Sequence, residues 1–185
     1  MPHIDTPPDH RYPWYVRLIF ALQRRKYGRE LEPARIWGRT PRVFAALSLL
    51  YGALDRKRSP IEPELRSLIT VRVSQINWCE FCVDLNSATA MARGASDGKL
   101  DALATFRDSP LFSARERVAL ELAEAMTYTG RRVEGEFLAR LKAEFDDDAL
   151  VELAGLIAFQ NLSSKFNSAL DVPAQGFCRA PAAGR

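Results

Sequence analysis

Two cysteines three residues apart, Cys79 and Cys82, lie between two stretches that both have a helical pattern. Apolar residues recur every three or four positions before the pair and again after it, which is the spacing of one helix face. Pro63 is placed to open the first helix and Gly94 to end the second. A thioredoxin-like site needs a strand before its CxxC segment, within a βαβ unit. The pattern therefore excludes a thioredoxin fold and favours a helical hairpin that carries the cysteines.

The rest of the chain has strong helix signals and weak strand signals. Prolines or capping residues mark the starts of several periodic segments, including a capping box at Ser113, and Gly28 and Gly130 are placed to end two of them. The sequence predicts an all-α protein of about seven or eight helices. The expected helices cover residues 13–27, 41–54, 63–76, 79–93, a short segment after Ser96, 113–129, 134–145, and a long final stretch capped by Asp146 or Asp147 that reaches Leu170.

Length and composition indicate one globular domain over residues 1–185. The chain is 47% hydrophobic and 26% charged, which is typical of a folded domain with its own core. We expect a mobile N-terminal segment over 1–12 and an irregular C-terminal tail over 171–185. A net charge of +3 is too small to predict nucleic-acid binding, and no apolar run approaches the roughly 20 residues of a membrane span. The N-terminus lacks the pattern of a secretory signal, so we expect a cytoplasmic protein.

The cysteine count directs attention to the close pair. Three cysteines are too few for a disulfide scaffold, and in a reducing cytoplasm a close pair is more often catalytic or metal-binding. A structural zinc needs four ligands, and only Cys178, His3 and His10 remain as candidates, so we expect no metal and no other cofactor. A third interpretation stays open, in which both cysteines are buried small apolar residues.

The predicted position of Cys79 and Cys82 suits thiol chemistry. A free cysteine has a pKa near 8.5, so only about 3% is thiolate at pH 7. The free N–H groups and the macrodipole at a helix start stabilise a thiolate, and residues three apart share one helix face. One sulfur can then be oxidised by a substrate while the other resolves it as a disulfide.

Residues 66–73 and 77–86 resemble the carboxymuconolactone decarboxylase and alkylhydroperoxidase D (AhpD) superfamily, and its peroxidase-related branch in particular. The resemblance extends over residues 40–178 and is densest at 61–94. It implies an AhpD-like helical bundle, assembly into homotrimers or homohexamers, and reduction of peroxide by the cysteine pair. In the hydroperoxidases the second cysteine attacks peroxide and the first resolves it. The resemblance thus makes Cys82 the peroxidatic candidate and Cys79 the resolving one.

The chain departs from the family motif at the two positions of its proton relay. The family has a glutamate twelve residues before the first cysteine and a histidine four after the second, where this chain has Ser67 and Asn86. Neither side chain titrates near neutral pH. If the chain reverses near Asn77, the two lie level on antiparallel helices and could hydrogen-bond each other or orient a water near Cys82. They could equally be two small polar groups of the core.

Three functions follow from these observations. The leading one is a thiol-dependent peroxidase or thiol-disulfide oxidoreductase of peroxiredoxin type, with a peroxide or disulfide substrate and a dithiol reductant. The alternatives are a carboxymuconolactone decarboxylase-like lyase and a non-catalytic oligomeric protein that binds or senses redox state. Cys178 is expected to be an unreactive thiol, with an extra redox role as the alternative. No nucleic-acid or membrane partner is expected.

Overall fold

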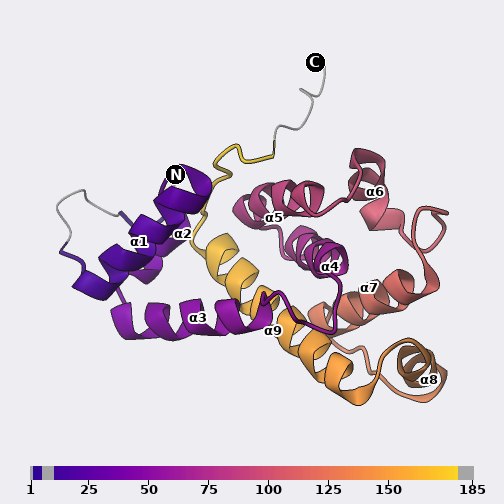
Figure 1. Ribbon diagram of the computed structural model, residues 1–185. Helices are drawn as coiled ribbons and strands as arrows, with labels where there is room; N and C mark the ends of the chain where they lie inside the picture. The colour runs from indigo at the N-terminus through magenta and orange to yellow at the C-terminus, as the bar shows by residue number, and fades with distance from the viewer. Residues whose placement is uncertain (1, 6–10, 179–185) are drawn as a thin grey trace.

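The protein is all-α over the residues that its computed structural model describes, 2–5 and 11–178 (Figure 1). These residues form nine α-helices and one short 3₁₀ helix: α1 (Trp14–Tyr27), α2 (Glu32–Trp37), α3 (Pro41–Leu54), α4 (Pro63–Ile76), α5 (Glu80–Ala92), α6 (Asp97–Asp101), η1 (Ala102–Thr105), α7 (Ala114–Thr127), α8 (Gly135–Glu144) and α9 (Asp147–Ala169). The predicted fold class and helical hairpin are confirmed. The sequence reasoning missed α2, whose six residues are too few to show a helical period.

Helix α4 lies at the centre of the main core and packs against α5, α7 and α9. Its Leu68, Ile69 and Val73 are fully buried. Two β-branched valines, Val71 and Val73, give this segment some strand character, but the helix forms because its apolar positions face three neighbouring helices. The hairpin of α4 and α5 is therefore held by the core rather than by its turn alone.

The turn between α4 and α5 lies at the predicted break. Trp78 has φ +54°, a left-handed conformation that is uncommon for a residue with a side chain. The Asn77 amide before it donates to Asn161 Oδ1 at 2.9 Å and to Ser164 Oγ at 2.8 Å, both on α9. These bonds fix the turn on α9, and Cys79 then becomes the N-cap of α5.

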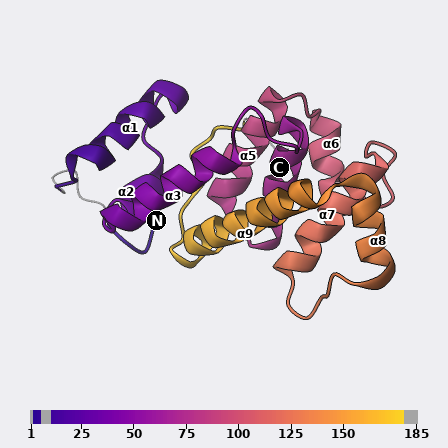
Figure 2. The same cartoon turned by 60° about the horizontal axis from the view of Figure 1, so that its bottom comes forward.

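Helices α1, α2 and α3 form a separate layer at the C-terminal end of α9, away from α7 and α8 (Figure 2). Their own small core contains Val16, Phe20 and Phe44. The Trp37 ring stacks on Phe166 of α9 with centroids 3.7 Å apart. The layer thus packs against the part of α9 that follows the main core.

The C-terminal segment ties this layer to α5. The buried Asp84 carboxylate accepts the backbone N–H groups of Gln175 at 2.9 Å and Cys178 at 2.7 Å. The Gln175 side chain in turn accepts the Glu32 N–H at the start of α2, at 2.9 Å. The Phe177 ring makes edge contacts with rings on α1 and α5. We call residues 172–178 the strap, because they join helices that are distant in sequence.

The predicted chain ends are described only in part. The strap has no helix, as expected for residues 171–178, whereas residues 179–185 lie outside the described part. Of the expected N-terminal segment, residues 1 and 6–10 also lie outside it, and the His3 N–H donates to the Leu170 carbonyl at 2.9 Å. None of the helices in the described ranges is long and apolar enough to cross a membrane.

Most of the predicted helix caps are present. Ser113 and Glu116 form the capping box of α7, and the Asp146 carboxylate accepts the Ala149 N–H at 2.7 Å to cap α9. Thr40, which immediately precedes α3 and is of a residue type that often caps helices, does not cap it, because its hydroxyl donates to the Trp37 carbonyl. The cap fixes the residue at which α9 begins. The start of the helix in turn determines which of its side chains face α5.

We expect Asp146→Ala to lower the free energy of unfolding by about 1 kcal/mol, because it removes the cap of α9. Asp148→Ala is the matched control, since it removes an equal charge from the same first turn without removing a cap. Urea unfolding followed by circular dichroism measures both. Equal losses in the two variants would contradict a capping role for Asp146.

Candidate thiol site

The two cysteines lie at the start of α5, and both are free thiols in this structure. Cys79 is the N-cap residue, and its sulfur accepts the Cys82 N–H at 3.2 Å. Cys82 is in the first turn, where backbone N–H groups lack helical partners. The side chains are 1% and 3% exposed, so both sulfurs are shielded from bulk solvent.

A polar face of α9 lies against Cys82. The Asn167 amide donates to the Cys82 sulfur at 3.2 Å, and Ser163 and Gln160 also hydrogen-bond the thiolate form. Residues 160, 163 and 167 are spaced at three and four positions, so they share one side of the helix. Asn167 is 1% exposed, and its Oδ1 has no hydrogen-bond partner among the described residues. An unused acceptor thus lies beside the sulfur.

These contacts make the two sulfurs electrostatically unequal. The hydrogen bond from the Cys79 thiol, supported by those from Asn167, Ser163 and Gln160, lowers the pKa of Cys82 although burial opposes the shift. The same bond with Cys82, together with burial, raises the pKa of Cys79. Cys82 is therefore the more readily ionised sulfur of the pair, and Cys79 the one that holds its proton more strongly.

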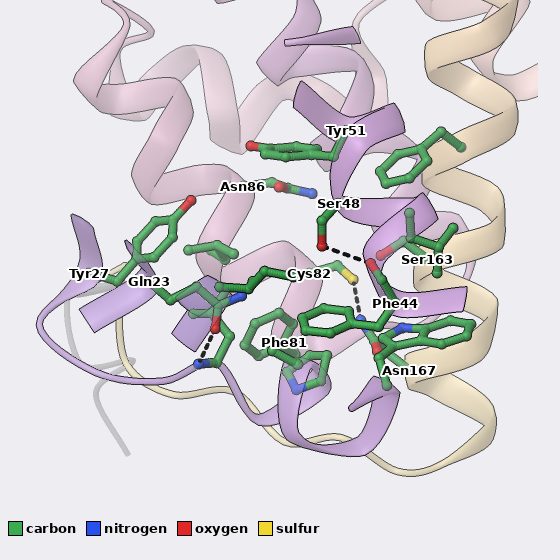
Figure 3. A pocket seen from close by; sticks show the side chains of 18 of the residues that line it. Gln23, Tyr27, Phe44, Ser48, Tyr51, Phe81, Cys82, Asn86, Ser163 and Asn167 are labelled. Carbon is green, nitrogen blue, oxygen red and sulfur yellow. Dashed lines mark hydrogen bonds between the residues drawn. The ribbon is translucent and has the colours of Figure 1, made fainter. Parts of the chain in front are cut away.

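The Cys82 sulfur faces a cavity of about 300 Å³, here called the Cys82 hollow (Figure 3). Its walls come from the α1–α3 layer, from α5 and from α9. Most of its lining is apolar or aromatic, including Leu31, Phe44, Leu47, Tyr51, Phe81 and Leu85. Its polar lining residues are Gln23, Lys26, Ser48, Asn86, Gln160, Ser163 and Asn167. Such a cavity suits a molecule with an apolar body and one polar reacting group.

Ser67 and Asn86, the two departures from the family motif, have separate hydrogen-bond partners. The Ser67 hydroxyl donates to the Pro63 carbonyl at 3.1 Å and accepts from Arg93 at 3.2 Å. The Asn86 amide donates to the Ser74 hydroxyl at 3.2 Å and to the Thr70 carbonyl at 3.4 Å. Asn86 lines the Cys82 hollow and Ser67 does not.

Ser67 belongs to a buried charged network instead. Arg93, which hydrogen-bonds its hydroxyl, also donates to both oxygens of Asp55, at 2.8 and 2.7 Å. Arg66, only 4% exposed, lies 3.5 Å from the same carboxylate. A negative charge is thus present near the family's glutamate position, but it comes from Asp55 and is neutralised by two arginines.

Asn86 belongs to a chain of polar groups that leads back to the sulfur. Ser74, fully buried on α4, accepts from Asn86 and also from Gln160 at 2.9 Å. Its own hydroxyl proton goes to the Thr70 carbonyl. Because Gln160 also contacts Cys82, the chain fixes the position of an amide beside the thiolate. None of its members titrates near neutral pH.

Cys79 faces a different cavity, of about 840 Å³, here called the Cys79 hollow. Its lining includes the exposed Trp78 and four carboxylates, Glu80, Asp84, Asp97 and Asp101, together with Met91 and Cys178. No lysine or arginine is among its described lining residues. The two cysteines therefore line different cavities, and they differ in charge: the lining at Cys79 carries four carboxylates, and the lining at Cys82 carries none.

Cys178 lies in the Cys79 hollow, where its sulfur contacts Met91 Sδ at 3.9 Å. Burial raises its pKa, and the nearby carboxylates of Asp84 and Asp97 raise it further. A raised pKa keeps this thiol protonated at neutral pH. Within the described ranges, no group of three or more His, Cys, Asp or Glu side chains is placed to hold a metal ion.

The sequence analysis missed the α9 face and the strap. Uncharged polar residues at 160, 163, 164 and 167 recur at helical spacing on α9, a signal that could have indicated a buried polar face. The strap left no such signal, because Asp84 resembles any other exposed carboxylate in the sequence. Its burial is a consequence of tertiary structure alone.

Comparisons with known proteins agree with this architecture. The family model described as the carboxymuconolactone decarboxylase family matches residues 41–125. Protein YnjA of Escherichia coli strain K12 is 50% identical over 178 residues, which cover 96% of this chain and 98% of YnjA.

Two solved structures resemble the fold. A peroxidase-related protein from Ralstonia eutropha JMP134, described as an alkylhydroperoxidase AhpD core, has a TM-score of 0.85 at 21% identity, with 95% of this chain and 94% of that chain covered. The debrominase Bmp8 has a TM-score of 0.77 at 22% identity, with 89% and 88% covered. The chain thus belongs to the carboxymuconolactone decarboxylase family, and it has the fold of the AhpD core.

Proposed function

We propose that the protein is a thiol-dependent peroxidase or thiol-disulfide oxidoreductase in which Cys82 attacks the substrate and Cys79 resolves the product. The observation that carries the proposal is the position of the Cys82 sulfur. It lines a mostly apolar cavity and contacts polar groups of α9, its pKa is lowered, and it lies beside a second thiol whose pKa is raised. A nucleophile, a space for substrate and a resolving group are thus brought together.

The proposed reaction with an organic hydroperoxide has two steps. The Cys82 thiolate attacks the terminal peroxide oxygen, the O–O bond breaks, and the leaving alkoxide takes a proton to become an alcohol. Cys79 then attacks the Cys82 sulfenic acid, forming the disulfide and releasing water. One proton from Cys79 and one from solvent end in the alcohol and the water, and the two sulfurs are oxidised as the peroxide is reduced.

Hydrogen bonds replace the family's proton relay in this proposal. The Asn167 amide N–H stabilises the attacking thiolate at 3.2 Å, and its unpartnered Oδ1 is available to accept the O–H of a hydroperoxide. Cys79 is the nearest group that holds a transferable proton. Without a group that titrates near neutrality, we expect slower turnover than a Glu/His relay supports, because general acid–base catalysis contributes about 10²–10⁴-fold.

The apolar lining of the Cys82 hollow favours a second candidate, removal of bromine from an aromatic ring. A solved structure shows a cysteine-to-alanine variant of the debrominase Bmp8 in complex with 2,3,4-tribromopyrrole. In the balanced reaction, the thiolate attacks bromine, the ring carbon takes a proton, and Cys79 displaces bromide to form the disulfide. The same two cysteines would act, so the candidates differ in substrate and not in the site.

The remaining predictions concern the oligomeric state of the protein, its cellular compartment and its reductant. We propose a homotrimer or homohexamer in the cytoplasm, with a dithiol as reductant. A lyase would use no cysteine pair, and a redox-sensing protein would form the disulfide without efficient turnover. Both alternatives are outcomes of the experiments below.

We expect Cys82→Ser to abolish consumption of cumene hydroperoxide with dithiothreitol as reductant, since the attacking sulfur is lost. Cys178→Ser is the matched control and should keep its activity, because that thiol lies outside the Cys82 hollow. Hydroperoxide loss is measured by a xylenol orange assay, and folding by circular dichroism. Equal activity of Cys82→Ser and the parent chain would end the thiol peroxidase proposal.

We expect alkylation of Cys82 by iodoacetamide to have its pH midpoint below 8.5, because only the thiolate reacts and its pKa is lowered. Reactivity should be lost as the pH falls through that pKa. Asn167→Leu should raise the midpoint by about one pH unit, since a hydrogen bond to a charged group contributes about 1.5–3 kcal/mol.

Ser168→Ala is the control for this measurement, because its hydroxyl points to the Trp78 carbonyl and not to the sulfur. Mass spectrometry of peptides separates Cys82 from the other two cysteines. A midpoint at the free-thiol value, unchanged by Asn167→Leu, would contradict thiolate activation and would favour the interpretation of two buried apolar cysteines.

A further inference from the structure

The two cysteines of the pair line two different cavities. Cys82 lines the apolar hollow between α9 and the α1–α3 layer, and Cys79 lines the hollow beneath α6 and the strap. No residue is shared between the two linings. A molecule that reaches Cys79 therefore need not pass through the space that a substrate of Cys82 would occupy.

The Cys79 hollow is strongly acidic. Glu80, Asp97 and Asp101 are exposed on its lining, and none of the three forms an ion pair within the described ranges. The fourth carboxylate, Asp84, is buried and held by the strap. Because the described lining includes no cation, the hollow attracts positive charge and repels negative charge over about a Debye length, roughly 10 Å at 0.1 M salt.

We propose that the Cys79 hollow is the entry site for the reductant, and that its carboxylates select a dithiol carried in positively charged surroundings over anionic thiols. The inference rests on the proposed function, because a reductant is needed only if the pair cycles through a disulfide. It names the chemical class of the reductant, a dithiol protein with basic residues around its reactive sulfur. A small anionic thiol such as glutathione is disfavoured.

The chemistry of exchange also favours attack at Cys79. The reductant's thiolate attacks Cys79 Sγ, the bond between Cys79 and Cys82 breaks, and its electron pair stays on Cys82. The better leaving group in thiol-disulfide exchange is the thiol of lower pKa, which here is Cys82. The reductant's second sulfur then attacks the mixed disulfide and releases Cys79, which takes up a proton. The pair gains two electrons and one proton, which comes from the reductant's second thiol, so that Cys82 remains a thiolate and the reductant leaves as a disulfide.

Trp78 gives this hollow an apolar contact beside its charges. The side chain is 86% exposed, and the left-handed backbone at φ +54° projects it from the turn that immediately precedes Cys79. Exposed tryptophans are enriched among residues that dominate protein interfaces. An aromatic group beside a reactive sulfur, with carboxylates around it, is the pattern expected for a basic protein partner.

The test measures reduction of the disulfide by small thiols of different charge. The Cys178→Ser chain is oxidised with diamide, and formation of the Cys79–Cys82 disulfide is checked by peptide mass spectrometry. It is then mixed with cysteamine, 2-mercaptoethanol or 3-mercaptopropionate, which are cationic, neutral and anionic. Samples are quenched with acid and alkylated, and each rate constant is corrected for the thiolate fraction of the reagent.

We expect cysteamine to react about tenfold faster than 3-mercaptopropionate at 20 mM salt, and the ratio to approach one at 0.5 M salt. Replacing two carboxylates, in Asp97→Asn/Asp101→Asn, should reduce the ratio severalfold. Glu134→Gln, an exposed carboxylate before α8, is the matched control and should leave the ratio unchanged.

Two results of this experiment would overturn the inference. Equal rates for the three thiols, or a ratio that the double variant does not change, would show that the acidic hollow is not the entry site. If this happens while peroxide turnover is normal, the proposed function stands and only the inference fails. If diamide produces no Cys79–Cys82 disulfide, the proposed function and the inference fail together.

Discussion

The left-handed turn at Trp78 is the constraint on which the site depends. A non-glycine residue in this conformation costs about 1–2 kcal/mol, so it persists only where neighbouring contacts hold it. Here the Asn77 amide supplies two hydrogen bonds to α9, and the packing of α4 against three helices fixes the rest. Because the chain turns at this residue, Cys79 caps α5 and Cys82 enters its first turn.

Helix α9 connects this turn to the main core around α4 and to the α1–α3 layer. Its first half packs into the main core through Leu153 and Ile157, and its second half carries the polar face that contacts Cys82. One helix therefore contributes both to stability and to the sulfur's environment. This explains why amides and hydroxyls, rather than ionisable groups, lie beside the thiolate. They keep their hydrogen-bonding capacity when buried, and a buried charge would need a partner.

Sequence reasoning predicted the all-α class, the break before the cysteines and most helix starts, because periodicity and capping are local signals. It also placed Cys79 and Cys82 at a helix start, which is confirmed. It did not predict α2, the role of Asn167 or the strap. These depend on contacts between residues about 85–145 positions apart, such as Asn167 with Cys82 and Gln175 with Glu32. No local pattern encodes such pairings, and the resemblance to a family covered the motif but not its supporting groups.

The strap has a consequence for the order in which the site is assembled during synthesis. The hairpin of α4 and α5 can form from neighbouring segments, but Asn167 and residues 172–178 leave the ribosome about 75–85 residues later. Until they arrive, nothing supplies the amide to Cys82 or closes the wall between α2 and α5. A nascent or truncated chain therefore carries two ordinary thiols. Activation of the sulfur is a property of the finished chain, so an incomplete product does not expose a reactive thiolate.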